Sequence, residues 1–339
     1  MAYYRIFLLI ICVWLTAESA LAQERMPTKS GFSGYIEILG AYISTNSQLN
    51  TDSGNKRTDS LDSAGDRTGK FRPFPLGLIR YTFAETRTQL YLGVLPENVV
   101  QGQFQIEAGV RQILGNGTGL RASVIPVTPI EPETWEDPFV VGQNRQRTDI
   151  NSFGVKLAAE HIMGSGLNLK YGWARQTIDD EKSGTFLFSQ PGSNLTPKDL
   201  DDLERDAHFH RFSAEYAFPI RPRMILKPAL RFTRSDADGD ANSFYGLTPQ
   251  LSLLYFSRQL QASLSASVNM DWYDDTHPVF DKTRRDVKPG IFAILGYKEP
   301  FGFNKFRIDW FNAYFRSTSN IDFYQSSTFV TAIGLGYTF

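Results

Sequence analysis

The stretch LQASLSASVNMDW (residues 260–272) decides how the rest of the sequence is read. Every second position is apolar or small, from Leu260 to Trp272, and the positions between them carry Gln, Ser, Asn and Asp. A repeat of two residues is that of a β-strand, because successive side chains point to opposite faces. At about 3.3 Å per residue, the run is about as long as a tilted strand that crosses a bilayer.

The stretch FVTAIGLGYTF (329–339) repeats this pattern at the C-terminal end of the sequence. One face carries Phe329, Thr331, Ile333, Leu335, Tyr337 and Phe339. Such a strand needs a partner for its backbone and an apolar surrounding for its rings. We therefore expect it to pair with the first strand of a closed barrel, with Phe339 at a boundary between water and lipid.

Residues 1–22 are typical of a secretory signal peptide that is removed. Arg5 precedes an apolar run from Ile6 to Leu15, and Ala20-Leu21-Ala22 is a small-x-small cleavage signal. The apolar run is too short for a spanning helix. The single cysteine lies inside it, so the mature chain, 23–339, is expected to lack disulfides and thiolate metal sites and to form one domain.

Composition favours a membrane barrel in the outer membrane of a Gram-negative bacterium. Aromatic residues make up 14% of the chain, yet the mean hydropathy is −0.27, as expected when one face of each strand meets lipid and the other meets water. The net charge of −1 gives no electrostatic reason to expect nucleic acid as a partner. The alternative is a secreted β-sandwich, whose strands would also alternate.

The predicted fold is all-β, a transmembrane antiparallel up-and-down barrel of about 14 strands, with 12 as the alternative count. The segments are 32–45, 71–84, 87–95, 101–113, 119–128, 147–162, 166–179, 207–218, 223–235, 243–257, 259–273, 286–298, 305–317 and 325–339. Most long polar connections fall at one end, and all the tight turns fall at the other. The connection 96–100 is a short exception, and 274–285 is expected to be a long one. Pro228 and Pro249 predict a bulge or a local opening, since proline removes a ladder hydrogen bond.

Aromatic residues near the segment ends predict two girdles, one at each water–lipid boundary. The girdle residues are Tyr81, Phe83, Trp173, Tyr216, Phe218, Tyr255, Trp272, Tyr337 and Phe339.

Charged residues on the opposite strand faces predict the wall of a pore. The predicted pore-lining residues are Glu107, Arg111, Lys156, Glu160, Lys170, Arg211, Glu215, Lys227, Arg231, Asp271, Arg307 and Asp309. In one interpretation they set ion selectivity, with a slight bias toward anions. In the other they pair and stiffen the wall, for instance Glu107 with Arg111 and Arg211 with Glu215.

Four stretches resemble a family of proteobacterial outer-membrane proteins known only as a domain of unknown function. They are GFSGYIEILGAYIST (31–45), NKRTDSLDS (55–63), KFRPFPLGLIRYTF (70–83) and ETWEDPF (133–139). The resemblance spans most of the mature chain and implies no catalytic or binding residues. The strand count also resembles that of monomeric fourteen-stranded porins that pass sugars. By analogy with such proteins, the terminal aromatic strand is a signal for the outer-membrane assembly machinery.

These patterns favour a porin-like passive channel for small hydrophilic solutes, in contact with the lipid bilayer and lipopolysaccharide. A first alternative is a structural or adhesive barrel occluded by its loops, acting through 46–70 and 180–206. Within the latter, Thr196, Pro197 and Asp199 predict the start of a short helix. A second alternative is a lipid-acting enzyme using His161 or His210 with strand serines. No nucleophile motif, catalytic residue, cofactor or metal site is predicted.

Overall fold

The computed structural model describes residues 26–99, 104–126 and 133–339. The predicted signal peptide, 1–22, lies outside the described residues, as do parts of the segments 101–113 and 119–128. Within the described ranges, no helix has both the length and the apolar character needed to cross a membrane.

The chain is almost entirely β-structure, with a few short helical turns. The strands are β1 (Gly31–Thr45), β2 (Thr68–Phe83), β3 (Thr88–Val94), β4 (Ile106–Ile113), β5 (Gly119–Ile125), β6 (Glu133–Trp135), β7 (Arg147–Glu160), β8 (Leu167–Ile178), β9 (Ala207–Tyr216), β10 (Phe218–Arg221), β11 (Met224–Ala237), β12 (Phe244–Phe256), β13 (Leu260–His277), β14 (Lys282–Lys298), β15 (Phe306–Ser319) and β16 (Ser326–Thr338). The helices are α2 (Pro96–Val99), α3 (Thr185–Phe188) and α4 (Pro197–Asp201). Single turns of 3₁₀ helix are η2 (Ser53–Asn55), η3 (Ile162–Gly164), η4 (Asp240–Asn242), η5 (Pro300–Gly302) and η6 (Asp322–Tyr324).

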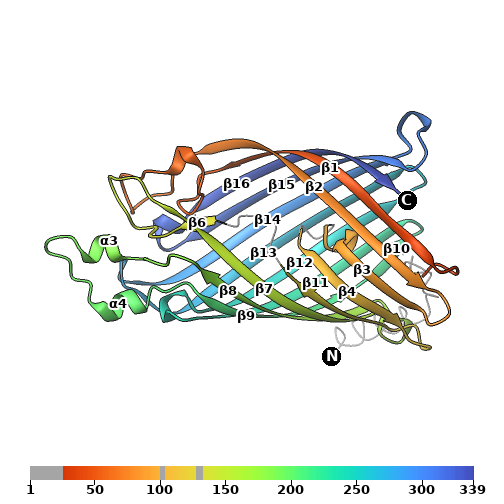
Figure 1. Ribbon diagram of the computed structural model, residues 1–339, viewed down its shortest axis with the longest axis horizontal. Coiled ribbons are helices and arrows are strands. Elements are labelled where there is room, and N and C mark those ends of the chain that lie inside the picture. Colours follow the sequence, from red (N-terminus) through yellow and green to blue (C-terminus); the bar gives the residue numbers. More distant parts are fainter. Residues whose placement is uncertain (1–25, 100–103, 127–132) are drawn as a thin grey trace, which may run out of the picture.

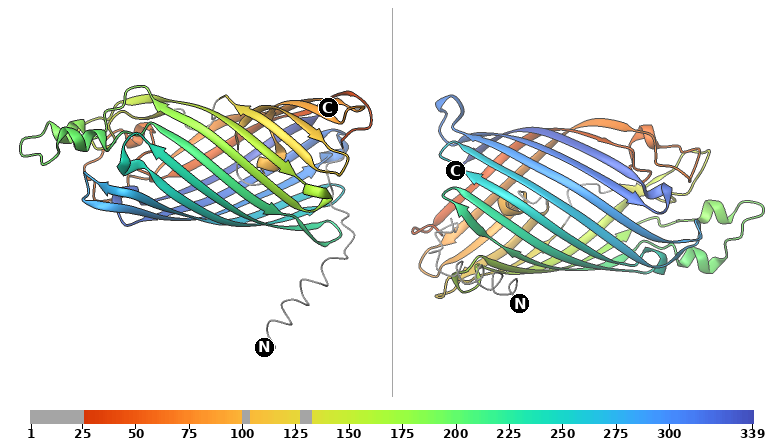
Figure 2. Two further views of the ribbon diagram at one scale, coloured as in Figure 1. Left: turned by 90° about the horizontal axis from the view of Figure 1, so that it is seen from below. Right: turned by 180° about the vertical axis from the view of Figure 1, so that it is seen from behind.

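These strands form one closed antiparallel barrel (Figures 1 and 2). Strands that follow one another in the chain are neighbours in the barrel, except for β6. This short strand is not part of the ring of strands and pairs only with the first residues of β7. β9 and β10 occupy one position beside β11, so the described residues build a barrel of fourteen strands. β16 pairs with β1 from Tyr35↔Thr338 to Thr45↔Thr328, which closes the barrel as the terminal pattern predicted.

The two mid-strand prolines interrupt the hydrogen-bond ladder without shifting its register. Pairing of β11 with β9 stops at Ala229, and pairing with β10 resumes at Leu226, so the gap includes Pro228. Between β12 and β13 the pairing stops at Leu247 and resumes at Gln250, on either side of Pro249. The predicted local opening is therefore confirmed, and it explains why one barrel position holds two short strands.

The barrel is apolar outside and polar inside along most strands. On β1, Ile38 is 71% exposed on the outer face, whereas its neighbour Glu37 is 1% exposed on the inner face. On β16, Ile333 and Leu335 are exposed, and Gly334 and Gly336 face inward. This arrangement inverts that of a soluble protein, whose large apolar side chains are mostly buried.

The two ends of the barrel differ in their connections, as the sequence predicted. Long connections with α3 and α4 lie at one end, here called the loop end, and tight turns and the C-terminus lie at the other (Figure 1). The predicted loop 274–285 was wrong, because β13 continues to His277 and β14 begins at Lys282. A register shift between Trp272 and Thr276 lets this hairpin extend beyond the barrel.

The predicted outer loop 96–100 was also wrong, because the described start of this connection folds into the barrel as α2. Leu95 and Val99 are buried in an apolar cluster with inward side chains of β1, β2, β14 and β15. Where the described residues continue after the connection, the ring of Phe104 lies 6.1 Å from that of Phe292 and 6.2 Å from that of Phe311. Burial of apolar surface on this part of the inner wall explains the inward course.

Polar contacts fix the same inserted segment. The hydroxyl of Tyr35 donates to the carbonyl of Val94 at 2.8 Å. Asn98 Nδ2 donates to Glu107 Oε1 at 2.7 Å, and Glu97 forms an ion pair with Arg121 at 2.7 Å. The segment is therefore anchored to β1, β4 and β5 and occupies part of the lumen.

Candidate functional site

The connections at the loop end pack into a cap with its own apolar core. We define the cap as the described parts of five connections, which are 46–67, 133–146, 179–206, 278–281 and 320–325. Phe139, Leu203, Ile321 and Phe323 are buried at its centre. The ring of Phe139 lies 5.3 Å from the ring of His277. Because the connection between β5 and β7, which carries Phe139, lies almost opposite the connection between β13 and β14 around the barrel, this contact takes it across the mouth.

Arg145 joins two of the cap connections. Its side chain is fully buried and stacks over Trp135, with 4.6 Å from the guanidinium carbon to the ring centroid. Its nitrogens donate to the carbonyls of Gln48 (2.9 Å) and Asn55, and Trp135 Nε1 also donates to Gln48 O. Burial lowers the pKa of Arg145 to about 10, so the guanidinium stays charged at neutral pH.

Asp137 holds the connection that carries α3. Its carboxylate accepts hydrogen bonds from the backbone nitrogens of Phe139 (2.9 Å), Gly184 (3.1 Å) and Phe186 (2.9 Å). Burial raises the pKa of Asp137, and these hydrogen bonds act in the opposite direction. The cap is thus held by directed bonds as well as by its apolar core.

The predicted short helix in 180–206 is confirmed as α4. The Thr196 side chain accepts from the backbone nitrogen of Asp199, and the Asp199 carboxylate accepts from Thr196 in return. Both α3 and α4 project outward from the loop end (Figure 1). The connection that crosses the mouth is instead 133–146, for which the sequence patterns predicted no such role.

The structure places the twelve predicted pore-lining residues on the inner face of the barrel, mostly in ion pairs. Lys156 on β7 pairs with Glu107 on β4, across the intervening strand β5 (2.8 Å). Glu215 holds both Lys170 (2.8 Å) and Lys227 (2.7 Å), each on a neighbouring strand. Further pairs are Arg111 and Arg121 with Glu160, Arg307 with Glu37 and Asp309, and Asp271 with Lys288.

The pairs suggested by sequence spacing were wrong. Glu107 pairs with Lys156 rather than Arg111, and Glu215 pairs with two lysines rather than Arg211. The partners of Glu215 come from adjacent strands, because side chains across a ladder are closer than those four residues apart on one strand. Lys156 reaches Glu107 across β5, where the small Ser123 stands opposite Lys156. Asp286 and Lys288, which join this network, were missed although they occupy inward positions of a predicted strand.

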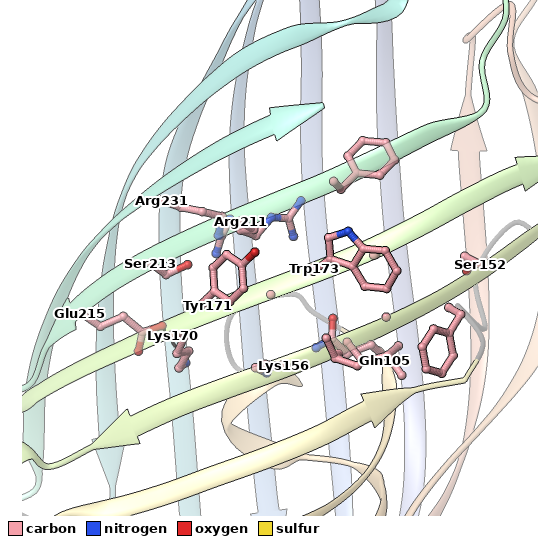
Figure 3. A pocket seen from close by; sticks show the side chains of 17 residues that line it. Gln105, Ser152, Lys156, Lys170, Tyr171, Trp173, Arg211, Ser213, Glu215 and Arg231 are labelled. Carbon is pink, nitrogen blue, oxygen red and sulfur yellow. Dashed lines mark hydrogen bonds and ion pairs between the residues drawn. The ribbon is translucent and has the colours of Figure 1, made fainter. Parts of the chain in front are cut away.

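Arg211 and Arg231 differ from the other charged residues of the wall. They lie on the neighbouring strands β9 and β11 (Figure 3). In the register of these strands, Arg211 stands opposite Thr233 and Arg231 stands opposite Ser213. Among the described residues, neither forms an ion pair with a carboxylate. Arg231 Nε is buried and has no hydrogen-bond partner there.

This arginine pair borders two cavities in the lumen. The lower cavity, of about 300 Å³, lies against β7, β8 and β9 and also contains Lys156, Lys170 and Glu215 (Figure 3). The upper cavity, of about 500 Å³, lies between the arginine pair and the cap and reaches β14, β15 and the start of β16. A solute that moves through the lumen along these cavities passes both guanidinium groups.

The predicted girdle residues lie on the outer face or at the turn end. The ring of Tyr81 contacts those of Phe32 (4.8 Å) and Phe83 (4.7 Å), and Tyr216 contacts Phe218 (4.3 Å). Tyr337 lies beside Phe306, and Trp173 stacks on His208. Tyr255 on β12 and Trp272 on β13 point outward. The backbone of Phe339 pairs with that of Gly34.

The histidines considered for an enzyme lie apart. His210 is on the outer face, with its Nδ1 2.8 Å from the hydroxyl of Tyr171, and His161 is in the turn after β7. Within residues 26–99, 104–126 and 133–339, no three His, Cys, Asp or Glu side chains gather in a way that could hold a metal ion.

Comparison with solved structures finds other barrels of similar extent. A loop-deletion mutant of OmpT from Vibrio cholerae is 9% identical over 91% of this chain and 99% of its own, with a TM-score of 0.44. An anion-selective porin from Comamonas acidovorans is 10% identical over 92% and 99%, with a TM-score of 0.41. The channel DcaP of Acinetobacter baumannii is 11% identical over 92% and 97%, with a TM-score of 0.42.

None of the curated proteins compared with the chain matches it. A family model does match, over residues 31–338, from the first barrel strand to the last. Its description is protein of unknown function (DUF2860), and the chain belongs to this family.

Proposed function

We propose that the protein is an outer-membrane channel through which small hydrophilic solutes diffuse, with a preference for anions. The observation that carries this proposal is the arginine pair, Arg211 and Arg231, at the border of two lumen cavities. Cationic side chains that line a pore raise the local concentration of anions and repel cations.

Because most charged residues of the wall are ion-paired, only a few of them attract anions. A paired lysine and glutamate, such as Lys156 and Glu107, leave little net field at a distance. Arg211 and Arg231 have no such partner among the described residues, so their charges act on the solute path. The paired residues stiffen the wall, and the arginine pair supplies the selectivity.

The outer surface supports the proposed location. Exposed apolar side chains such as Ile36, Leu157 and Leu295 occupy strands around the barrel, and rings cluster at the turn end. Such a band matches a lipid bilayer, with lipopolysaccharide at the loop end and the terminal β16 available to the assembly machinery.

Planar-bilayer recording of the refolded full chain tests the channel. We expect ion-conducting steps, and a reversal potential in a KCl gradient that shows preference for chloride. The variant Arg211→Gln/Arg231→Gln should conduct with the preference lost. The matched control is Arg175→Gln, an exposed cation on the outer face of β8, which should behave as the unmodified protein. Absence of conducting steps, or an unchanged preference in the double variant, would overturn the proposal.

The cap favours a second candidate, a barrel occluded by its loops that acts as a structural or adhesive protein. The contact of Phe139 with residues from the opposite side of the mouth is the observation in its favour. Whole-cell binding that is lost when 46–67 and 179–206 are trimmed, together with silent bilayers, would support this candidate over the channel.

A further inference from the structure

We infer that the upper cavity is a binding site for a small polyhydroxylated oxyanion, such as a sugar acid or a sugar phosphate. The inference rests on the proposed function in that the site lies on the solute path. Its volume of about 500 Å³ falls in the ~300–1,000 Å³ range of small-molecule sites.

The charge of the lining is the first argument. The cationic side chains that face the cavity are Arg211, Arg231, Arg284 and Lys288, and none of its described lining residues is a carboxylate. Behind them, Asp286 contacts Arg284 (2.6 Å) and Lys288 (3.0 Å), and Asp271 contacts Lys288 (2.9 Å). These two acids balance two of the cations.

The remaining cations, Arg211 and Arg231, lie side by side on the neighbouring strands β9 and β11. β12, β13 and β14 separate them from Phe315 and Ser317 on β15, which line the other side of the cavity. No ion pair links either arginine to a carboxylate among the described residues. A guanidinium presents a planar fork of donors that suits a carboxylate or a phosphate.

Hydroxyl groups are the second argument. The lining includes seven serine and threonine side chains, which are Ser47, Thr233, Thr248, Ser267, Ser317, Ser326 and Thr328. The hydroxyl of Ser317 is buried and has no hydrogen-bond partner among the described residues, and the same holds for Arg231 Nε on the opposite wall. Hydroxyl groups both donate and accept, so a polyhydroxylated solute satisfies them better than a simple ion does.

An aromatic ring completes the site. Phe315 lies on the inner face, yet 42% of it is exposed, and it lines the cavity. A Cβ added at Gly290 would lie 2.5 Å from Phe315 Cδ1, so the glycine makes room for the ring to lie over the strand β14. The free ring face offers apolar contact to the C–H face of a sugar, while the cations hold the acid group.

Binding to the detergent-purified full chain tests the inference without requiring conduction. Isothermal titration compares gluconate, glucose 6-phosphate, glucose, inorganic phosphate and acetate. We expect the two charged sugars to bind at least tenfold more tightly than glucose or the simple anions, and the stronger of the two identifies the preferred acid group. If glucose bound as tightly as the charged sugars, the cations would have no role in binding. If acetate and inorganic phosphate bound as tightly as the charged sugars, the hydroxyl groups and the ring would have none.

Variants separate the parts of the site. Arg231→Gln should weaken the binding of the charged sugars about tenfold, and Phe315→Leu should weaken it while leaving the binding of inorganic phosphate unchanged. Gly290→Ala tests the ring position by displacing Phe315, and Arg175→Gln is the control on the outer face. Circular dichroism and the heat-dependent gel shift check that each variant is folded.

Different experimental results would reject the binding site and the channel. Conducting steps without binding of charged sugars would reject the site and leave the channel. Binding without conducting steps would retain the site and place it in an occluded barrel. Unchanged binding in folded Arg231→Gln and Phe315→Leu would also reject the site.

Discussion

The ring of Phe139 lies 5.8 Å from the ring of Phe280, although the two residues belong to connections on opposite sides of the barrel mouth. Phe323, from a third connection, lies 5.4 Å from Phe139. The contact makes the cap one packed unit rather than a set of separate loops. Any solute that enters from the loop end must pass around this unit or move it.

Replacing Phe139 should therefore open the mouth. Phe139→Ala removes the ring that meets His277, Phe280 and Phe323, and loss of a buried ring costs about 3–5 kcal/mol. We expect a larger single-channel conductance and more frequent conducting states. Phe188→Ala, in the exposed part of α3, is the matched control and should leave conductance unchanged. Equal conductance of Phe139→Ala and the unmodified protein would show that the cap does not limit passage.

Arg145 should be the residue on which the cap depends most. Arg145→Met leaves buried carbonyls of Gln48 and Asn55 without their charged donor, at a cost of about 2–3 kcal/mol or more. We expect faster cleavage of 46–67 and 133–146 by proteinase K, with the barrel intact on a gel. Arg57→Gln, which removes an exposed ion pair with Asp59, should be cleaved at the original rate. A resistant Arg145→Met would contradict this assignment.

The carboxylate of Glu215 neutralises the charges of two lysines, so its loss should change both the stability of the barrel and the ion selectivity of the channel. Glu215→Gln leaves Lys170 and Lys227 close together without a carboxylate between them, which we expect to destabilise the barrel by about 3 kcal/mol. The temperature at which the heat-dependent gel shift occurs should fall, and the preference for chloride should rise. Lys227→Gln is the comparison, since Lys170 still pairs with Glu215; a stability loss as large as that of Glu215→Gln would contradict the prediction.

Gly93 should tolerate no side chain. Its φ of 133° is rare for other residues, and a Cβ there would lie 2.1 Å from the carbonyl oxygen of Gly77. Gly93→Ala should therefore destabilise the barrel by more than ~1 kcal/mol and reduce the refolded yield. Gly77→Ala is the matched control, because its Cβ would meet Tyr35 O at an ordinary 3.4 Å. Similar yields for the two variants would refute the argument.

The barrel could be predicted from the sequence because alternation with a period of two is local. Segments such as 260–272 and 329–339 show it directly, and their strands formed as expected. The inward course of α2 was not predictable in the same way. It depends on Leu95 and Val99 meeting apolar side chains of distant strands, and a short polar connection looks the same whichever way it turns.

The ion-pair partners of the charged residues could not be predicted from local sequence patterns either. The pairing of Lys156 with Glu107 follows from the register of strands that are not consecutive in the chain, and spacing along one strand does not contain it. The cap did leave a trace in the sequence. The stretches 55–63 and 133–139, noted only as marks of a family, hold Asn55 and Trp135, which meet through Arg145.

The backbone pair between Gly34 and Phe339, with N–O distances of 3.0 Å in both directions, sets a condition on how the molecule is made. Gly34 and Phe339 lie far apart in the sequence, so the contacts of this ladder have a high contact order. Loops of that length close slowly, and this one can close only after Phe339 has been synthesised. Until then the two edge strands of the open sheet have unpaired backbone groups and can aggregate. A catalyst that binds the open sheet and speeds its closure would shorten this period.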